Sequence, residues 1–252
     1  MEAKHIKKAF LKCGIKPGDS LFIHGDAGAV AQIKVKSRNK INYFFKYLKE
    51  YVGREGNIII PTFTYSACKE KKFDINKNIS ETGLFSEIFR NQKYTKRTNH
   101  PIFSCAIYGK KYKYFDQAKI TTCFGSDSIF ERFLKLNGTI VCIGCSLDRI
   151  TFTHYAEEIF KVNYRYHKNF KIYLTKKKKY IDIDYYVRKL TQNSRIDLSK
   201  LNKYLITKKR IKEINFGRYK LITVKSKDFF KSCLELLSKN KNSLVKKNNQ
   251  NL

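Results

Sequence analysis

The segment Gly138-Thr139-Ile140-Val141-Cys142-Ile143-Gly144 is an apolar, β-branched run between two glycines, and it predicts a buried strand. Shortly after it comes Asp148-Arg149-Ile150-Thr151-Phe152-Thr153-His154-Tyr155-Ala156-Glu157-Glu158. This order places His154 just past the C-terminal end of the strand, where open α/β sheets bind their ligands. The two segments therefore predict an α/β sheet with a candidate site at its edge.

The second segment also has the spacing of a general base with its support. If it is helical, Thr151, His154 and either Glu157 or Glu158 share one face, three and four residues apart. A carboxylate can then orient the imidazole while it accepts a proton. The other interpretation is a capped surface helix with a buried, hydrogen-bonded histidine, because a three-residue spacing is a weak signal. The segment alone leaves both open.

Apolar periodicity and turn residues predict the surrounding elements. We expect helices at 3–13, 40–52, 84–91, 128–136 and 152–160, and strands at 20–24, 58–61, 104–108 and 139–143. Their alternation predicts a layered α/β/α architecture with a central mixed sheet. A C-terminal antiparallel extension follows, with a hairpin at 169–174 and 179–185, strands at 211–215 and 219–224, and helices at 197–206 and 227–238.

The chain has 252 residues, which is enough to bury one large core. We expect a single domain over residues 1–238, made of a core at 1–160 and a basic antiparallel and helical extension at 161–238. Residues 239–252 are rich in lysine and asparagine and contain no acidic residue. That composition predicts a disordered tail.

The formal net charge of +32 is extreme. Residues 1–160 carry 27 basic against 15 acidic side chains, and residues 161–252 carry 26 against 6, so the C-terminal part is the more basic. A nonenzymatic nucleic-acid or polyanion-binding protein is therefore one hypothesis. Nucleic acid is disfavoured because the charges are scattered and no zinc-finger, RRM or KH signature is present. Whether the charge is functional or compositional stays open.

The cysteines and the apolar runs indicate which cellular location and which cofactors to expect. Seven cysteines, an odd number without regular spacing, predict reduced thiols. Cys142 and Cys145 form a Cys-x-x-Cys without a second pair at zinc-finger spacing, so no metal is expected. No apolar run approaches eighteen residues and the N-terminus lacks an uninterrupted apolar segment. We therefore expect a cytoplasmic protein without a membrane span.

Five further segments accompany the strand and the His154 motif: LFIH (21–24), VGREGNIIIPTFT (52–64), ETGLFSEIFR (81–90), KRTNHPIFS (96–104) and FGSDS (124–128). In this order, over roughly residues 20 to 160, they resemble the aminoglycoside 3-N-acetyltransferase family of acetyl-CoA-dependent N-acyltransferases. Two departures are visible. The family usually has His-Ser-Ser or His-Ser-Asp in place of His24-Gly25-Asp26, and Arg-Ser in place of Arg97-Thr98. The first removes a hydroxyl near the donor and acceptor and bears on substrate identity.

The resemblance implies direct acyl transfer from acetyl-CoA to an amine, without a covalent enzyme intermediate and without a metal. His154 is the expected general base, Glu157 the residue that orients it, and Thr151 a donor to the thioester oxygen. The residues expected to bind acetyl-CoA are His24, Gly25, Asp26, Arg97, His100 and Ser104. Those expected to contact the substrate are Thr62, Thr64 and Glu158, the last also a substitute for Glu157.

The charge bears on the acceptor. A positive field attracts the phosphates of coenzyme A and repels a polycationic aminoglycoside. The first hypothesis is therefore an N-acetyltransferase acting on an amino sugar in glycan or nucleotide-sugar biosynthesis. The alternative is an aminoglycoside 3-N-acetyltransferase that confers antibiotic resistance. The sequence names neither the acceptor nor the acyl chain, and it leaves the oligomeric state, a homodimer included, undecided.

Overall fold

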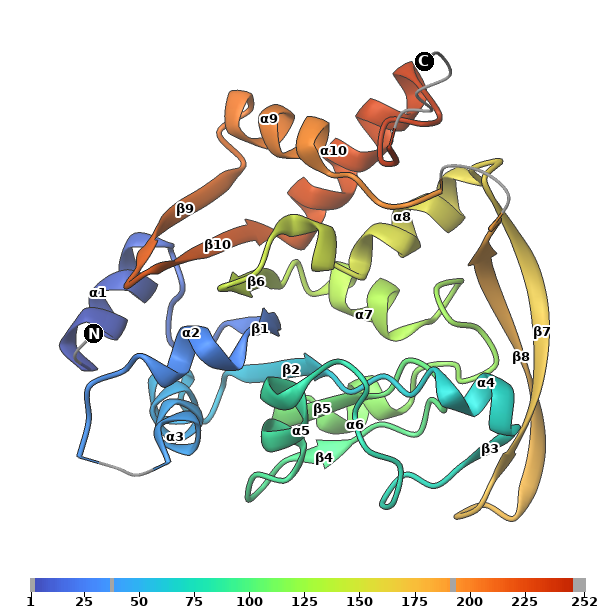
Figure 1. Ribbon diagram of the computed structural model, residues 1–252, viewed down its shortest axis with the longest axis horizontal. Coiled ribbons are helices and arrows are strands. Elements are labelled where there is room, and N and C mark those ends of the chain that lie inside the picture. The colour runs from blue at the N-terminus through green and yellow to red at the C-terminus, as the bar shows by residue number, and fades with distance from the viewer. Residues whose placement is uncertain (1–2, 37–38, 191–193, 247–252) are drawn as a thin grey trace.

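The computed structural model describes residues 3–36, 39–190 and 194–246. Its strands are β1 (Ser20–Gly25), β2 (Asn57–Pro61), β3 (Lys72–Phe73), β4 (Lys96–Arg97), β5 (Cys105–Gly109), β6 (Thr139–Ile143), β7 (Arg165–Leu174), β8 (Lys179–Arg188), β9 (Ile211–Phe216) and β10 (Tyr219–Lys225). Seven of them form one sheet in the order β4-β5-β2-β1-β6-β10-β9, and the other three form a second sheet in the order β3-β7-β8 (Figure 1).

The centre of the large sheet is parallel and its flanks are antiparallel. β1 pairs in parallel with both β2 and β6, so the carboxyl ends of these three strands lie along one edge. β5 pairs antiparallel with β2, and β10 antiparallel with β6. The mixed sheet predicted from the sequence is confirmed.

Helices cover both faces of the large sheet (Figure 1). They are α1 (Ala3–Lys12), α2 (Ala27–Ala31), α3 (Lys40–Val52), α4 (Ser66–Glu70), α5 (Leu84–Arg90), α6 (Tyr112–Asp116), α7 (Ile129–Lys135), α8 (Phe152–Phe160), α9 (Ser199–Thr207) and α10 (Ser226–Lys239), with a 3₁₀ turn, η1, at Leu147–Arg149. The α/β/α layering is likewise confirmed.

The side chains of the central strands alternate between two apolar layers, as the pleat of a strand requires. Phe22 and Ile140 belong to the layer that contains the buried faces of α7, α8 and α10. Leu21 and Val141, one residue away on the same strands, belong to the layer that contains α1, α3 and α5. Because β1 and β6 are buried on both faces, they read as continuous apolar runs in the sequence.

The C-terminal extension does not form one separate unit. β7 and β8 make the expected hairpin, which is longer than predicted and pairs with β3. β9 and β10 instead complete the large sheet next to β6. The short helices α2, α4 and α6 and the two-residue strands β3 and β4 were not predicted, because five residues or fewer carry no readable periodicity.

The prediction of disorder from residue 239 onward is wrong for the part that the structure describes. α10 extends to Lys239, and the following Leu244 and Val245 are buried against the core. Val245 also bridges to Ile196, and Asp197 donates its N–H to the carbonyl of Leu244. Two apolar residues in a basic segment anchor it. Residues 247–252 lie outside the described residues.

In the described residues, no helix combines the length and the apolar character that a membrane crossing requires.

Candidate active site

The helix that bears His154 forms where it was predicted. α8 begins at Phe152, directly after Thr151, and its Phe152, Tyr155 and Ala156 side chains are buried in the apolar layer beneath. This pattern fixes the rotation of the helix and turns His154 away from the core, so that 21% of its side chain is exposed. Because α8 follows β6 and η1, the imidazole lies beyond the carboxyl end of a central strand.

The residue that supports His154 is Glu157, one turn later on α8. The Nδ1 atom of His154 lies 2.7 Å from Oε2 of Glu157, whose side chain is completely buried. Tyr164 donates its hydroxyl to the other carboxylate oxygen at 2.9 Å. Arg165, the first residue of β7, places Nε 2.6 Å from Oε2. A buried carboxylate with these partners is held in one orientation.

The pKa values of Glu157 and His154 are both lowered, which suits a neutral base next to an ionised carboxylate. Burial would raise the pKa of Glu157, but the contacts with His154, Arg165 and Tyr164 outweigh it and lower that pKa, so the carboxylate is ionised. Burial and the charge of Arg165 lower the pKa of His154, against the opposing effect of Glu157. The imidazole is therefore neutral near pH 7.

The proton of that neutral imidazole is best assigned to Nδ1. Arg165 Nη2 also lies 2.8 Å from Nδ1, but a nitrogen that donates to a carboxylate cannot accept from a guanidinium. The carboxylate is the stronger acceptor for both groups, so we assign the Nδ1 proton to the bond with Glu157. Nε2 is then the ring nitrogen with a lone pair to accept a proton.

Glu158 faces a different part of the molecule. Its carboxylate lies against the backbone of Gly125, where an added Cβ would be 2.8 Å from Oε1. Burial and the nearby Asp184 raise the pKa of Glu158 to about 7. Glu158, His167 and Asp184 bring ligand atoms within 4.8 Å of one another, the one His and carboxylate group among the described residues with metal-site spacing. His167 and Asp184 are already paired at 2.8 Å and partly exposed, so the group is a weak metal site.

A cavity of about 540 Å³, a size typical of small-molecule sites, opens at the carboxyl ends of β1 and β2. Asp26 caps α2 by accepting the N–H of Gly28 at 2.6 Å. His24 Nε2 is buried and has no hydrogen-bond partner among the described residues, and burial lowers the pKa of this histidine to about 3. The residues of this donor cavity, as we call it, include His24, Gly25, Asp26, Phe63, Tyr65, Glu81, Phe85, Cys145, Arg149 and Thr151.

Four other predicted site residues lie in a buried polar cluster. Arg97 donates from Nη2 to the carbonyl of Thr62 at 2.5 Å and to Oγ1 of Thr64 at 2.7 Å, and from Nε to Oγ of Ser104 at 2.9 Å. Its Nη1 reaches the carbonyls of Ile75 and Asn78. With its donors engaged and its side chain buried, Arg97 is not free to bind a phosphate. The geometry favours a structural role for Arg97, Thr62, Thr64 and Ser104.

His100 has a comparable structural position. Its Nδ1 accepts the backbone N–H groups of Ile102 and Phe103 at 3.1 and 2.9 Å, and Nε2 lies 3.1 Å from the carbonyl of Thr122. Burial lowers the pKa of His100 to about 4. A neutral ring with both nitrogens bonded to backbone groups organises this loop and leaves no atom for a cofactor.

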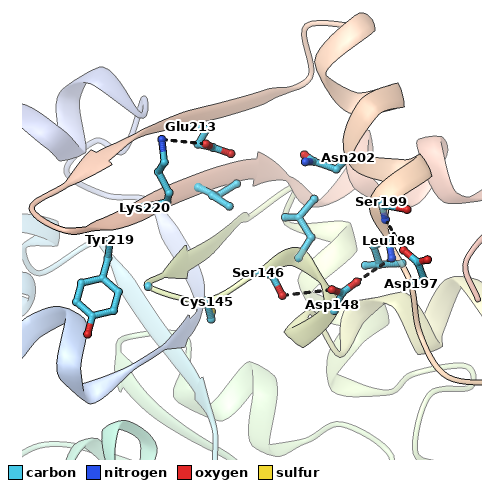
Figure 2. Close-up of a pocket in the computed structure, with 13 residues that line it drawn as sticks. Cys145, Ser146, Asp148, Asp197, Leu198, Ser199, Asn202, Glu213, Tyr219 and Lys220 are labelled. Atoms are coloured by element: carbon cyan, nitrogen blue, oxygen red, sulfur yellow. Dashed lines mark hydrogen bonds and ion pairs between the residues drawn. The ribbon is translucent and has the colours of Figure 1, made fainter. Parts of the chain in front are cut away.

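A second cavity, of about 490 Å³, lies between the end of β6, α9 and the β9–β10 hairpin (Figure 2). It is lined by the apolar side chains of Leu198 and Ile222 and by carboxylates that are already engaged. Asp148 accepts the N–H of Leu198, and Glu213 is paired with Lys220. Cys145 belongs to the walls of both cavities.

Sequence reasoning missed Arg165 and Tyr164. Both follow α8 across a turn and contact Glu157: Tyr164 immediately precedes β7, and Arg165 is its first residue. No periodicity links a helix residue to a strand seven or eight positions later, and only the presence of polar residues in that turn could have drawn attention to them.

Comparison with known proteins places these features in a family. Residues 22–238 match the family model described as aminoglycoside 3-N-acetyltransferase. The chain is 24% identical over 190 residues to aminoglycoside N(3)-acetyltransferase III of Pseudomonas aeruginosa, covering 66% of this chain and 65% of that protein. It is 24% identical over 167 residues to the SPbeta prophage-derived aminoglycoside N(3')-acetyltransferase-like protein YokD of Bacillus subtilis (strain 168), covering 57% and 60%. The chain thus spans less than two thirds of either curated relative.

Solved structures agree on the fold. The apoenzyme of aminoglycoside acetyltransferase AAC(3)-IVa matches with a TM-score of 0.81 at 20% identity, over 97% of this chain and 91% of that one. A histidine-to-alanine variant of that enzyme in complex with a gentamicin matches with 0.79 at 20% identity, over 98% and 92%. AAC-IIIb in its binary complex with CoASH matches with 0.78 at 15% identity, over 95% and 97%.

Proposed function

Because this chain belongs to the aminoglycoside 3-N-acetyltransferase family, whose members are acetyl-CoA-dependent N-acetyltransferases, we propose that it transfers the acetyl group of acetyl-CoA to an amino group of an aminoglycoside. The observation that carries the proposal is the contact of 2.7 Å between His154 and the buried, ionised Glu157. This pair lies one helical turn after Thr151, which lines the donor cavity. A base and a cavity for a thioester are thereby close together.

The reaction requires a base because an ammonium group is not a nucleophile. Nε2 of His154 takes a proton from the acceptor nitrogen as that nitrogen attacks the thioester carbonyl. The C–N bond forms, the C–S bond breaks, and the leaving sulfur departs as the thiol of coenzyme A after it receives a proton. The imidazolium that forms is stabilised by the anionic Glu157, and Arg165 and Tyr164 keep that carboxylate in place.

The donor is proposed to occupy the cavity at the ends of β1 and β2. AAC-IIIb, of the same fold, binds CoASH. In this chain His24 lines the cavity, and its Nε2 is buried without a hydrogen-bond partner among the described residues. Gly25 lies so close to Phe85 that a Cβ would approach its ring to 2.5 Å, so glycine keeps the loop and the helix in contact. Thr151 is the candidate donor to the thioester oxygen.

The names of the relatives favour an aminoglycoside as the acceptor over the amino sugar of the biosynthetic hypothesis. That hypothesis depended on the overall charge of +32. Acidic residues are nevertheless present around the candidate site: Asp26 and Glu81 line the donor cavity, and Asp184 lies beside Glu158 of α8. Such groups would attract ammonium groups locally despite the net charge. These acidic residues support an aminoglycoside acceptor.

A thiol-release assay tests the proposal. Purified protein is incubated with acetyl-CoA and, separately, with gentamicin, sisomicin, apramycin, glucosamine and a nucleotide-linked amino sugar. We expect release of free coenzyme A that depends on an aminoglycoside, with a product one acetyl group heavier by mass spectrometry. Release with the nucleotide-linked amino sugar alone would instead support the biosynthetic hypothesis, and release with none of them would contradict the enzyme assignment for these acceptors.

A further inference from the structure

Cys145 occupies an unusual position among the seven cysteines. It lines both the donor cavity and the second cavity, and Figure 2 shows it in the wall of the latter. Its Sγ lies 3.4 Å from the carbonyl of His24, at the end of the neighbouring strand β1. Cys145 and Cys68 are partly exposed, whereas the other five are buried. A thiol at this place is accessible from a cavity of small-molecule size.

A second thiol, that of Cys142, lies three residues earlier, in β6. Cys142 is buried in β6, where it pairs with His24 of β1 and Ile222 of β10. Gly144 has a φ of +73°, a left-handed conformation that turns the chain sharply at the end of the strand. Beyond this turn, Cys145 packs against the apolar cluster that contains Cys142, and Cys142 is the largest influence on the pKa of Cys145. The pair is a dithiol with one accessible member.

The ionisation of the two partly exposed cysteines differs. The hydrogen bond from Cys142 is the largest influence on Cys145 and lowers its pKa, assisted by Arg149 and opposed by burial and by Asp26. Burial and the nearby Glu81 raise the pKa of Cys68 to about 11. The thiolate is the nucleophile in disulfide exchange, so Cys145 should be the more reactive of the two.

We propose that Cys145 is a thiol–disulfide exchange site for low-molecular-weight disulfides, with Cys142 as the resolving thiol. The Cys145 thiolate attacks one sulfur of the small disulfide, forms a mixed disulfide and releases one thiolate. Cys142 then attacks Cys145 Sγ, loses its proton and forms the Cys142–Cys145 disulfide, and the second small thiol leaves. The protein dithiol is oxidised by two electrons and the small disulfide is reduced to two thiols.

The consequence for catalysis rests on the proposed function. If the donor cavity holds coenzyme A, a mixed disulfide on Cys145 would occupy that cavity and block acetyl-CoA. Coenzyme A disulfide would then also react faster than oxidised glutathione, because the cavity binds the nucleotide part before the exchange.

The test uses the full-length reduced protein, challenged separately with oxidised glutathione and with coenzyme A disulfide, and followed by intact mass and peptide mapping. Wild type should lose two hydrogens and yield a Cys142–Cys145 cross-linked peptide. Cys142→Ser should accumulate one mixed disulfide on Cys145, and Cys145→Ser should give neither product. Cys68→Ser, the matched control, should behave as wild type. Circular dichroism verifies that each variant is folded.

Quantitatively, Cys145 should be modified at least about tenfold faster than Cys68, as its greater thiolate fraction requires. Equal rates at the two cysteines, or modification of Cys68 first, would overturn the proposal. Because mass is measured rather than turnover, the result is independent of acetyl transfer. Modification of Cys145 at the same rate by both disulfides would support the exchange site and contradict only the placement of coenzyme A in the donor cavity.

Discussion

At the level of single residues, the protonation state of His154, the candidate base, is set by burial and by its neighbours Arg165 and Glu157. A histidine three positions before a glutamate lies next to it on a helix surface, and such a surface pair contributes only ~0.2–0.5 kcal/mol. Here Glu157 is completely buried and is held by Arg165 and Tyr164 as well as by His154. An ionised carboxylate in that position favours the imidazolium, whereas burial and Arg165 disfavour it. The balance leaves a neutral base with a support that cannot move.

Glu157→Gln tests this balance through the pH dependence of kcat/KM. In wild type the pKa of His154 is lowered below its usual 6.5, so the low-pH midpoint of kcat/KM, where the base becomes protonated, should lie below pH 6.5. Removing the carboxylate charge withdraws the one group that raises this pKa. The low-pH midpoint should therefore move further down, and the plateau should drop by about 10² to 10⁴.

The adjacent carboxylate provides the control. Glu158→Gln replaces a carboxyl group that lies against Gly125, and whose pKa is raised to about 7, by an uncharged amide of the same shape, and it should leave the low-pH midpoint in place. If both variants moved the midpoint equally, the specific contact of Glu157 with His154 would not be what tunes the base.

Between the elements, Arg97 on β4 connects segments that are distant in sequence. It joins β4 to the end of β2 through Thr62 and Thr64, and to the 75–78 loop through backbone carbonyls. These contacts fix the loops after β2, which form part of the donor cavity through Phe63 and Tyr65. Arg97 thus supports one wall of the donor cavity without lining it.

Arg97→Ala should therefore destabilise the fold before it affects donor affinity. Each buried carbonyl left without a donor costs about 1 to 3 kcal/mol, so the free energy of unfolding should fall by about 3 kcal/mol or more in urea titrations. Arg97→Lys keeps the charge but cannot span the same acceptors, and most of the loss should persist. Normal unfolding with weakened coenzyme A binding in both variants would instead identify Arg97 as a phosphate ligand.

The elements themselves were largely predictable, and their tertiary partners were not. β6 and α8 were predicted at their observed bounds, because a long apolar run and a 3.6-residue apolar pattern are strong local signals. From the sequence, Arg97 and Ser104 are expected to bind the cofactor and Thr62 and Thr64 the substrate, because a sequence does not reveal that a charged residue is surrounded by backbone carbonyls from two other segments. The contacts of Arg165 and Tyr164 were missed for the same reason.

At the scale of the whole molecule, two properties interact. β9 and β10 continue the sheet that carries the site, and we propose that residues 3–246 fold as one domain rather than as a core with an appendage. The chain carries a net charge of +32, whereas Asp26 and Glu81 line the donor cavity. For a cationic acceptor, the long-range field is therefore repulsive while the local carboxylates are attractive.

Ionic strength separates these two effects. As the Debye length shrinks from about 30 to 10 Å, the attraction of the whole molecule for acetyl-CoA weakens and its kcat/KM should fall. The kcat/KM for gentamicin should rise over the same range, because the long-range repulsion is screened before the close contacts are. Steady-state kinetics at constant pH gives both slopes. A fall for both substrates would mean that the local carboxylates dominate the approach of the acceptor.

The most direct measurement of the central claim is the single-turnover rate of His154→Ala with saturating acetyl-CoA and gentamicin, compared with wild type, together with coenzyme A affinity by calorimetry. Loss of the general base should slow acetyl transfer by about 10² to 10⁴, which raises the barrier by about 2.7 to 5.5 kcal/mol. Coenzyme A affinity should stay unchanged, because His154 is outside the donor cavity. A near wild-type rate, or a rate loss explained entirely by weaker coenzyme A binding, would contradict the assignment of His154 as the base.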